Sequence, residues 1–102
     1  MNKIVYNITA KVRWDILEDW LAWQLGVQIP ATLATKLFDD HQFYRLLEQD
    51  EEEGPTFVIQ FFTSSLERYR TFTSEKEAGL MKAGWERWGN AHIAFRTLME
   101  SV

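Results

Sequence analysis

The chain has 102 residues, 46% of them hydrophobic and 15% aromatic, with a formal net charge of −4 at pH 7. That composition is too apolar for a disordered chain, and the length suits one hydrophobic core, so we expect a single domain over residues 1–102. The negative charge argues against a surface for nucleic-acid phosphates, and the absence of cysteine excludes disulfides, Fe–S clusters and thiolate catalysis. No stretch approaches the roughly 20 apolar residues of a membrane span, and no signal-peptide run opens the chain, so we expect a cytoplasmic protein.

The first part of the chain predicts a strand followed by two helices. Residues 4–12 alternate with the period of two that is typical of a half-buried strand. Asp15 and Glu18 have capping-box spacing, and an apolar stripe then continues to Gly26, which predicts a helix between these points. The Ile29-Pro30 step predicts a second, short helix, because proline is tolerated in the first turn.

The rest of the chain predicts a hairpin, two helices and a last strand. An acidic turn at 50–55 separates two strands, and its glycine and proline favour a change of chain direction. Ser64 with Glu67, and Ser74 with Glu77, have the spacing of helix-capping boxes. The expected elements are strands at 42–49 and 55–63, helices at 64–72 and 74–89, and a strand at 91–100.

The order strand, helix, strand, strand, helix, strand predicts a ferredoxin-like α+β fold. In this βαββαβ arrangement two right-handed crossovers place the helices on one face of a four-stranded antiparallel sheet. The other face is then bare in a monomer. The strand at 55–63 is apolar on both faces, with Phe57 and Ile59 on one and Val58 and Phe62 on the other. We therefore expect a second copy to cover the bare face, giving a homodimer.

The facing of each strand is predicted by turning its most apolar set toward the helices. This rule assigns Ile4/Tyr6/Ile8, Phe57/Ile59/Phe61 and Ile93/Phe95/Met99 to the helix side. The predicted dimer-face residues are Val5, Thr9, Val58, Phe62 and Leu98. For the second strand either Tyr44/Leu46 or Phe43/Arg45/Leu47 could face the partner, and the pattern leaves both open.

Four polar residues share the predicted dimer face and form the candidate ligand site: Asn7, Gln60, His92 and Arg96. A buried arginine needs a carboxylate or several acceptors. Arg96 is therefore predicted either to bind an anion or carbonyl in the dimer cavity, or to form an interface salt bridge with a carboxylate such as the partner's Glu48 or Glu100.

No catalytic residue, metal site or cofactor is predicted. His41 lies beside Asp39 and Asp40, but at the start of a strand these are more typical of turn and capping residues than of metal ligands. The sequence holds neither a Gly-x-Ser-x-Gly elbow nor a glycine-rich phosphate loop. Of the five tryptophans, Trp20, Trp85 and Trp88 are predicted in the core, whereas Trp14 and Trp23 lie beside the stripe.

Two segments, 50–57 and 94–100, resemble a family of short bacterial proteins known only as a domain of unknown function. The opening 4–9 and the Ile29-Pro30 step fit the same pattern. By topology this family is similar to the dimeric α+β barrels, which include cofactor-free monooxygenases and small stress-response proteins. The resemblance implies a fold and a dimer but no activity. The chain departs from the family pattern at Gln28 and at Lys76-Glu77-Ala78, where histidines are common, which argues against a shared histidine chemistry.

Three functions are compatible with these features. The favoured one is a homodimer that is structural or binds a small ligand without catalysis. The alternatives are a cofactor-free enzyme acting on a small aromatic substrate in the barrel, and a module whose bare sheet face docks a different protein.

Overall fold

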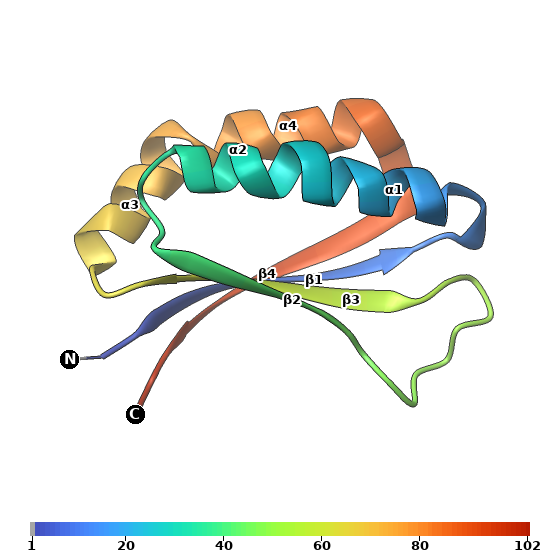
Figure 1. Cartoon of the computed structure of the whole chain (residues 1–102), viewed down its shortest axis with the longest axis horizontal. Helices are drawn as coiled ribbons and strands as arrows, with labels where there is room; N and C mark the ends of the chain where they lie inside the picture. The colour runs from blue at the N-terminus through green and yellow to red at the C-terminus, as the bar shows by residue number, and fades with distance from the viewer. Residues whose placement is uncertain (1) are drawn as a thin grey trace.

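The computed structural model describes residues 2–102 and places its helices over one face of an antiparallel sheet (Figure 1). The strands are β1 (Ile4–Val12), β2 (Asp40–Arg45), β3 (Thr56–Thr63) and β4 (His92–Glu100). The α-helices are α1 (Leu17–Trp23), α2 (Ile29–Ala34), α3 (Leu66–Glu75) and α4 (Glu77–Trp88). Short helical turns join them: η1 (Trp14–Ile16), η2 (Gln24–Gln28) and η3 (Gly89–Ala91).

The four strands lie in the order β2-β3-β1-β4, and each neighbouring pair is antiparallel. β1 and β3 are therefore the central strands, while β2 and β4 form the edges. This is the split βαβ arrangement with helices on one side. The predicted ferredoxin-like α+β fold is confirmed.

An aromatic core lies between the helices and the sheet. Tyr6 from β1 is at its centre, with its ring centroid 5.2 Å from that of Phe72 in α3 and 5.8 Å from that of Phe38. Trp20 from α1 is fully buried and packs on Phe57 of β3 at 5.2 Å. Each such ring removes roughly 150–250 Å² from water, so a few of them supply much of the burial in a small domain.

The first helical segment is longer than predicted. Asp15 pairs with Arg13 at 2.7 Å instead of capping a helix. Gly26, the predicted end, lies inside the π-helical turn η2, and α2 follows directly with Pro30 in its first turn, as predicted.

Two other local predictions are corrected. Ser65, and not Ser64, caps α3, because its hydroxyl accepts a hydrogen bond from the backbone N–H of Arg68 at 3.2 Å. α4 begins at Glu77 without any side-chain cap. β2 ends at Arg45, short of the predicted Gln49, and Arg45 then pairs with Glu51 in the following loop at 2.6 Å.

The predicted facing of β4 is wrong. The register with β1 puts His92, Ala94 and Arg96 beside Val12, Ala10 and Ile8, which is the helix side of the sheet. Leu98, predicted on the dimer face, pairs with Tyr6 and also stands on the helix side. Ile93, Phe95 and Met99, predicted on the helix side, lie on the opposite face and are 54%, 66% and 38% exposed. β4 is an edge strand, and its more apolar face is turned away from the helices.

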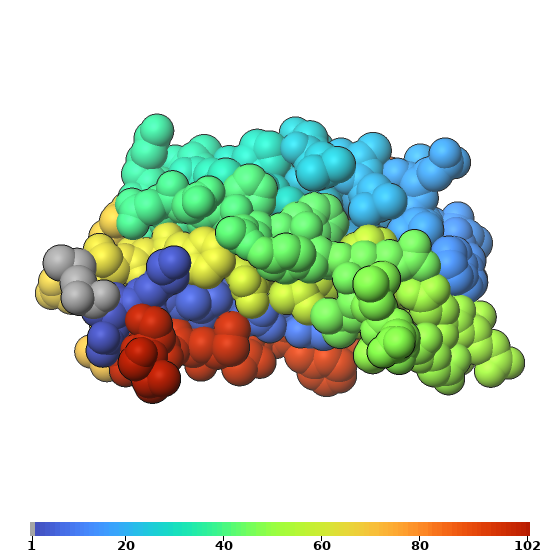
Figure 2. Space-filling view, turned by 60° about the horizontal axis from the view of Figure 1, so that its bottom comes forward, coloured from blue at the N-terminus to red at the C-terminus, as the bar shows by residue number. Residues whose placement is uncertain are grey.

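We call the surface without helices the open face. Figure 2 shows segments of all four strands adjoining one another on it. Val5, Thr9, Val58 and Phe62 lie on this face, as predicted, because their neighbours in sequence point to the core. β2 adds Tyr44, opposite Val58 and 49% exposed, which decides the facing that the sequence left open.

One tryptophan lies outside the core against the prediction. Trp20 and Trp88 are buried as expected, whereas Trp85 is 64% exposed on α4. Trp14 is half-exposed and donates its indole N–H to the backbone carbonyl of Glu51 at 2.8 Å. Trp23 lies against Trp88 at 5.8 Å and lines the cavity described next.

Candidate functional site

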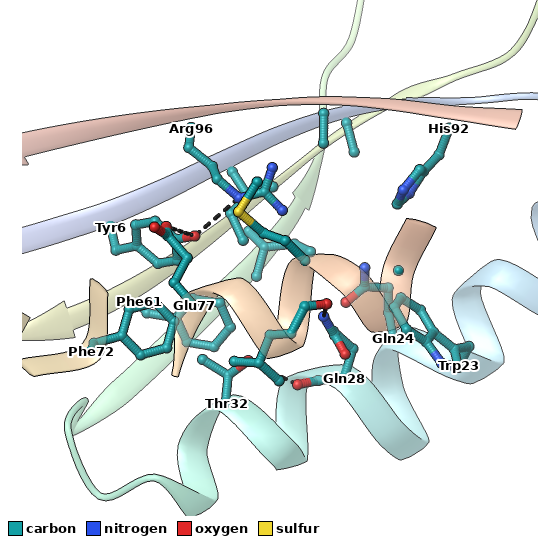
Figure 3. Close-up of a pocket in the computed structure, with 17 residues that line it drawn as sticks. Tyr6, Trp23, Gln24, Gln28, Thr32, Phe61, Phe72, Glu77, His92 and Arg96 are labelled. Carbon is teal, nitrogen blue, oxygen red and sulfur yellow. Dashed lines mark hydrogen bonds between the residues drawn. The ribbon is translucent and has the colours of Figure 1, made fainter. Parts of the chain in front are cut away.

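A cavity of about 40 Å³ lies between the sheet and the helices (Figure 3). Strands β1, β3 and β4 form one wall, and η2 with the helices α1 to α4 forms the other. A space of this volume holds about three water molecules. Its walls are partly apolar, but they also carry eight side chains with N–H groups or oxygen atoms: Tyr6, Trp23, Gln24, Gln28, Thr32, Glu77, His92 and Arg96.

Tyr6 joins two charged side chains at one end of the cavity. Its hydroxyl donates to Glu77 Oε2 at 2.6 Å and accepts from Arg96 Nε at 3.1 Å. Burial and the hydrogen bond to Glu77 raise the pKa of Tyr6 far above its ordinary value, and the nearby Arg96 offsets this only in part. Tyr6 is therefore a fixed proton donor to Glu77. The pKa of Tyr69 is also raised, by burial and by the charge of Glu77.

The Arg96 guanidinium keeps most of its hydrogen-bonding capacity for the cavity. Its Nε donates a hydrogen bond to the Tyr6 hydroxyl. Among residues 2–102 the guanidinium forms no other hydrogen bond and no ion pair. The side chain descends from β4 toward the helices, as Figure 3 shows. Its two terminal nitrogens form the flat fork that binds carboxylates with two parallel hydrogen bonds.

His92 is held in one tautomer by Trp20. The indole Nε1 of Trp20 lies 3.0 Å from His92 Nδ1. An indole N–H only donates, so Nδ1 is the unprotonated acceptor and the neutral ring carries its proton on Nε2. Burial, followed by the charge of Arg96, lowers the pKa of His92. His92 therefore presents an N–H donor near Gly84, where an added Cβ would lie 3.8 Å from Nε2.

Gln24 brings an unsatisfied acceptor to the same space. Its side chain is only 6% exposed, and its Oε1 has no hydrogen-bond partner among the described residues. Figure 3 shows its amide pointing between the helices and β4. Gln28, at the other end of the π turn, does have a hydrogen-bond partner: its Nε2 donates to the carbonyl of Leu80 at 2.9 Å. A π turn is frequent at functional sites, and here it places Gln24 in the wall of the cavity.

A wider groove of about 310 Å³ adjoins the cavity between α4 and the edge strand β4. The two spaces share Met81, His92, Ala94 and Arg96 as lining residues. Met81 is 43% exposed, and its unbranched side chain adopts alternative rotamers more easily than the surrounding rings. The cavity therefore has a neighbouring opening to solvent with one adaptable side chain beside it.

The structure separates the four predicted ligand residues into two pairs. Arg96 and His92 line the cavity together, on the helix side of the sheet. Asn7 and Gln60 lie on the open face, where Gln60 Nε2 donates to Asn7 Oδ1 at 3.2 Å. Sequence reasoning missed Tyr6 and Glu77 as partners of Arg96, and nothing in the local pattern relates two residues 71 positions apart.

Neither a metal cluster nor a membrane span emerges from the described part of the chain. Within residues 2–102 no group of three or more His, Asp or Glu side chains is placed to hold a metal ion. In the same range the helices are too short or too polar to cross a bilayer.

The sequence of residues 3–102 matches the model of a protein family described as a domain of unknown function, DUF4286. The chain belongs to the DUF4286 family. This match agrees with the resemblance carried by segments 50–57 and 94–100. None of the curated proteins matches the sequence.

Solved structures with the same fold come from distant proteins. A dimeric ferredoxin-like protein from an uncultured marine organism is 10% identical, with a TM-score of 0.71 over 100% of this chain and 97% of the other. A protein of the ethyl tert-butyl ether D (EthD) family from Bacillus halodurans is 13% identical, with a TM-score of 0.65 over 97% of each chain. A dimeric ferredoxin-like protein from Jannaschia is 8% identical, with a TM-score of 0.56 over 92% and 97%. These similarities establish the fold that this DUF4286 chain shares with dimeric proteins.

Proposed function

We propose that this DUF4286 protein is a homodimer that binds a small molecule in the helix–sheet cavity of each protomer. The observation that carries the proposal is the unpartnered Oε1 of Gln24 in a cavity that also holds the free terminal nitrogens of Arg96. Leaving a buried acceptor unsatisfied costs about 1–3 kcal/mol. A ligand that supplies a donor removes this cost when it binds.

Binding fits the geometry better than catalysis does. Tyr6 is held protonated by Glu77, and His92 accepts from Trp20 on Nδ1, so neither group is a free base. The Glu77 carboxylate accepts the Tyr6 hydroxyl on its Oε2. These groups can orient and hold a molecule, but none is arranged to remove a proton from it.

The dimer is supported by the open face. Four large side chains on this face expose between 38% and 66% of their surface: Ile93, Phe95, Met99 and Tyr44. Large apolar side chains concentrated on one exposed surface normally mark an interface. Structures with the same fold are described as dimeric. Face-to-face packing of two sheets would cover this surface and leave the cavities on the outer sides.

The dimer is tested by sedimentation velocity across the micromolar range. The wild-type protein should sediment as a dimer, and Phe95→Glu should sediment as a monomer, because a glutamate in place of this exposed aromatic residue would bury an unpaired charge in the interface. Trp85→Glu is the matched control: Trp85 is also aromatic and about equally exposed, but it lies on α4 away from the open face. A monomeric wild type, or a dimer in Phe95→Glu, would refute this arrangement.

The ligand site is tested with ¹⁵N-labelled protein and mixtures of small acids, amides and alcohols. Binding in the cavity should shift the indole N–H signal of Trp23, which lines the cavity, and leave that of Trp14, which is bound to the loop carbonyl of Glu51. If no compound moves the Trp23 signal, or if Trp14 moves as much, the cavity is not a binding site.

A further inference from the structure

We propose that the cavity is selective for a small hydroxycarboxylate, with Arg96 and His92 holding the carboxylate and Gln24 accepting the hydroxyl. This specificity presupposes that the cavity binds a small molecule at all. It follows from the type and position of the groups that the protein leaves unpaired.

Arg96 provides the positive end of the site. A cation in this partly buried position is costly unless an anion or several acceptors compensate it. Glu77 lies close enough to share Tyr6 with Arg96, yet among the described residues it forms no ion pair with the guanidinium. The Tyr6 hydroxyl also screens the Glu77 charge by donating to it. The terminal nitrogens of Arg96 thus remain available for a carboxylate that enters the cavity.

His92 provides a second donor on the same strand, four residues before Arg96. Residues four apart on a strand lie on one face and roughly 13 Å apart along it, so the long Arg96 side chain must bend toward His92 to share a ligand. Both residues line the cavity and the adjoining groove. Because Trp20 is fully buried and its N–H is committed to Nδ1, His92 is fixed as an Nε2–H donor. A guanidinium and an N–H donor that line the same cavity suit an acceptor-rich group, as a carboxylate is.

Gln24 sets the second requirement. Its unpartnered Oε1 is an acceptor, so it cannot bind a carboxylate oxygen and instead needs an O–H or N–H on the ligand. Gln24 approaches from the helices, whereas Arg96 and His92 approach from β4. A ligand that satisfies both walls must carry acceptors at one end and a donor at the other. The volume of about 40 Å³ limits the part enclosed to a few heavy atoms.

Three probes of nearly equal size separate these requirements. Lactate has the carboxylate and the hydroxyl, propanoate lacks the hydroxyl, and lactamide lacks the charge. Their dissociation constants are measured by NMR titration, following the Trp23 indole signal. We expect lactate to bind about 2- to 10-fold more tightly than propanoate, and about 10-fold or more tightly than lactamide, from the strengths of neutral and charge-assisted hydrogen bonds.

Two variants assign the contacts. Gln24→Met has a similar shape without the acceptor, so it should abolish the preference for lactate over propanoate. Arg96→Gln should weaken both acids about 10- to 100-fold and change lactamide little. Because Gln24→Met removes an unsatisfied group, it should fold even if Arg96→Gln does not, so the first variant keeps the test decisive.

Each failure has a distinct meaning. Lactamide binding as tightly as lactate would overturn the carboxylate specificity but leave the cavity as a ligand site. An unchanged lactate-to-propanoate ratio in Gln24→Met would overturn the role of Gln24. If none of the three probes shifts Trp23 while other compounds do, the hydroxycarboxylate inference fails and the proposed function stands. If no compound of any class shifts Trp23, both fail.

Discussion

The two glycines inside α4 offer a matched pair of substitutions that tests the packing around the cavity. Gly84→Ala places a Cβ 3.6 Å from Trp23 Cη2 and 3.6 Å from His92 Cε1, which is ordinary van der Waals contact. Gly79→Ala places one where nothing lies within 4 Å. Each change improves helix propensity by about 1 kcal/mol. Only the first also buries a methyl group, which adds about 0.8 kcal/mol.

Gly84→Ala is therefore expected to raise the free energy of unfolding by about 1–2 kcal/mol, and Gly79→Ala by about 1 kcal/mol. The measurement is urea unfolding at one fixed protein concentration, because dimerisation makes stability depend on concentration. Comparable m-values are needed so that the midpoints report stability. A destabilised Gly84→Ala protein beside a stabilised Gly79→Ala protein would show that the space between α4 and His92 is tighter than the structure has it. The same methyl group approaches His92 Nε2, so lactate affinity should fall in Gly84→Ala and stay constant in Gly79→Ala.

Three further outcomes are expected. The pKa of His92 is lower in the folded chain than its unfolded value of about 6.5, so the unfolded state takes up the proton first as the pH falls. Stability measured by urea unfolding should therefore decrease as the pH falls from about 6.5 toward the folded pKa; His92→Gln should remove this part of the slope, with His41→Gln as the control. Tyr6→Phe should cost about 1–3 kcal/mol in the same assay, because it leaves two charged partners without their hydrogen bond; a cost below that of Tyr69→Phe would contradict the role of the hydroxyl. Gly54→Ala should destabilise by about 2 kcal/mol or more, because its Cβ would lie 1.7 Å from the carbonyl oxygen of Val12; Gly26→Ala, with open space around it, is its control.

The fold was predictable because local patterns and connection rules agree. β1 alternates in sequence, and the burial of β3 alternates along its whole length, because these central strands have a neighbour on each side and face the core on one side only. The acidic turn between the second and third strands fixes an antiparallel hairpin. Once the order of elements is known, right-handed crossovers leave few other topologies.

The site was only half predictable, because the facing of β4 violates the rule that the more apolar face is the core face. Ile93, Phe95 and Met99 are more apolar than His92, Ala94 and Arg96, yet they point away from the helices. Single-strand hydrophobicity cannot distinguish a core face from an interface face. The pairing register of β4 with β1 would distinguish the two faces, because it fixes which residues of β4 stand beside the core residues of β1. The sequence alone does not reveal this register.

The helical wall of the site was less predictable still. The sequence pattern did not predict the π turn, so Gln24 was indistinguishable from an ordinary polar residue on an amphipathic helix. Glu77 matches a capping box with Ser74, but the structure uses its carboxylate for Tyr6 instead. A long-range hydrogen bond to the neutral Tyr6 hydroxyl competes successfully with a local cap, and only the tertiary structure reveals which interaction forms.

The proposed dimer contact and the proposed ligand site lie on opposite faces of the sheet, and their independence can be tested. Phe95 and Arg96 are neighbours in β4, yet the first points to the open face and the second into the cavity. The cavity lies on the helix side of the sheet, opposite the open face, so the proposed dimer contact does not reach its lining residues. The monomer produced by Phe95→Glu should therefore bind lactate within about 2-fold of the dimer, a difference well below the strength of one hydrogen bond to a charged group. A much larger loss, in a variant that keeps the wild-type NMR signals of Trp20 and Trp23, would mean that the dimer completes the site and that the cavity alone is not the binding unit.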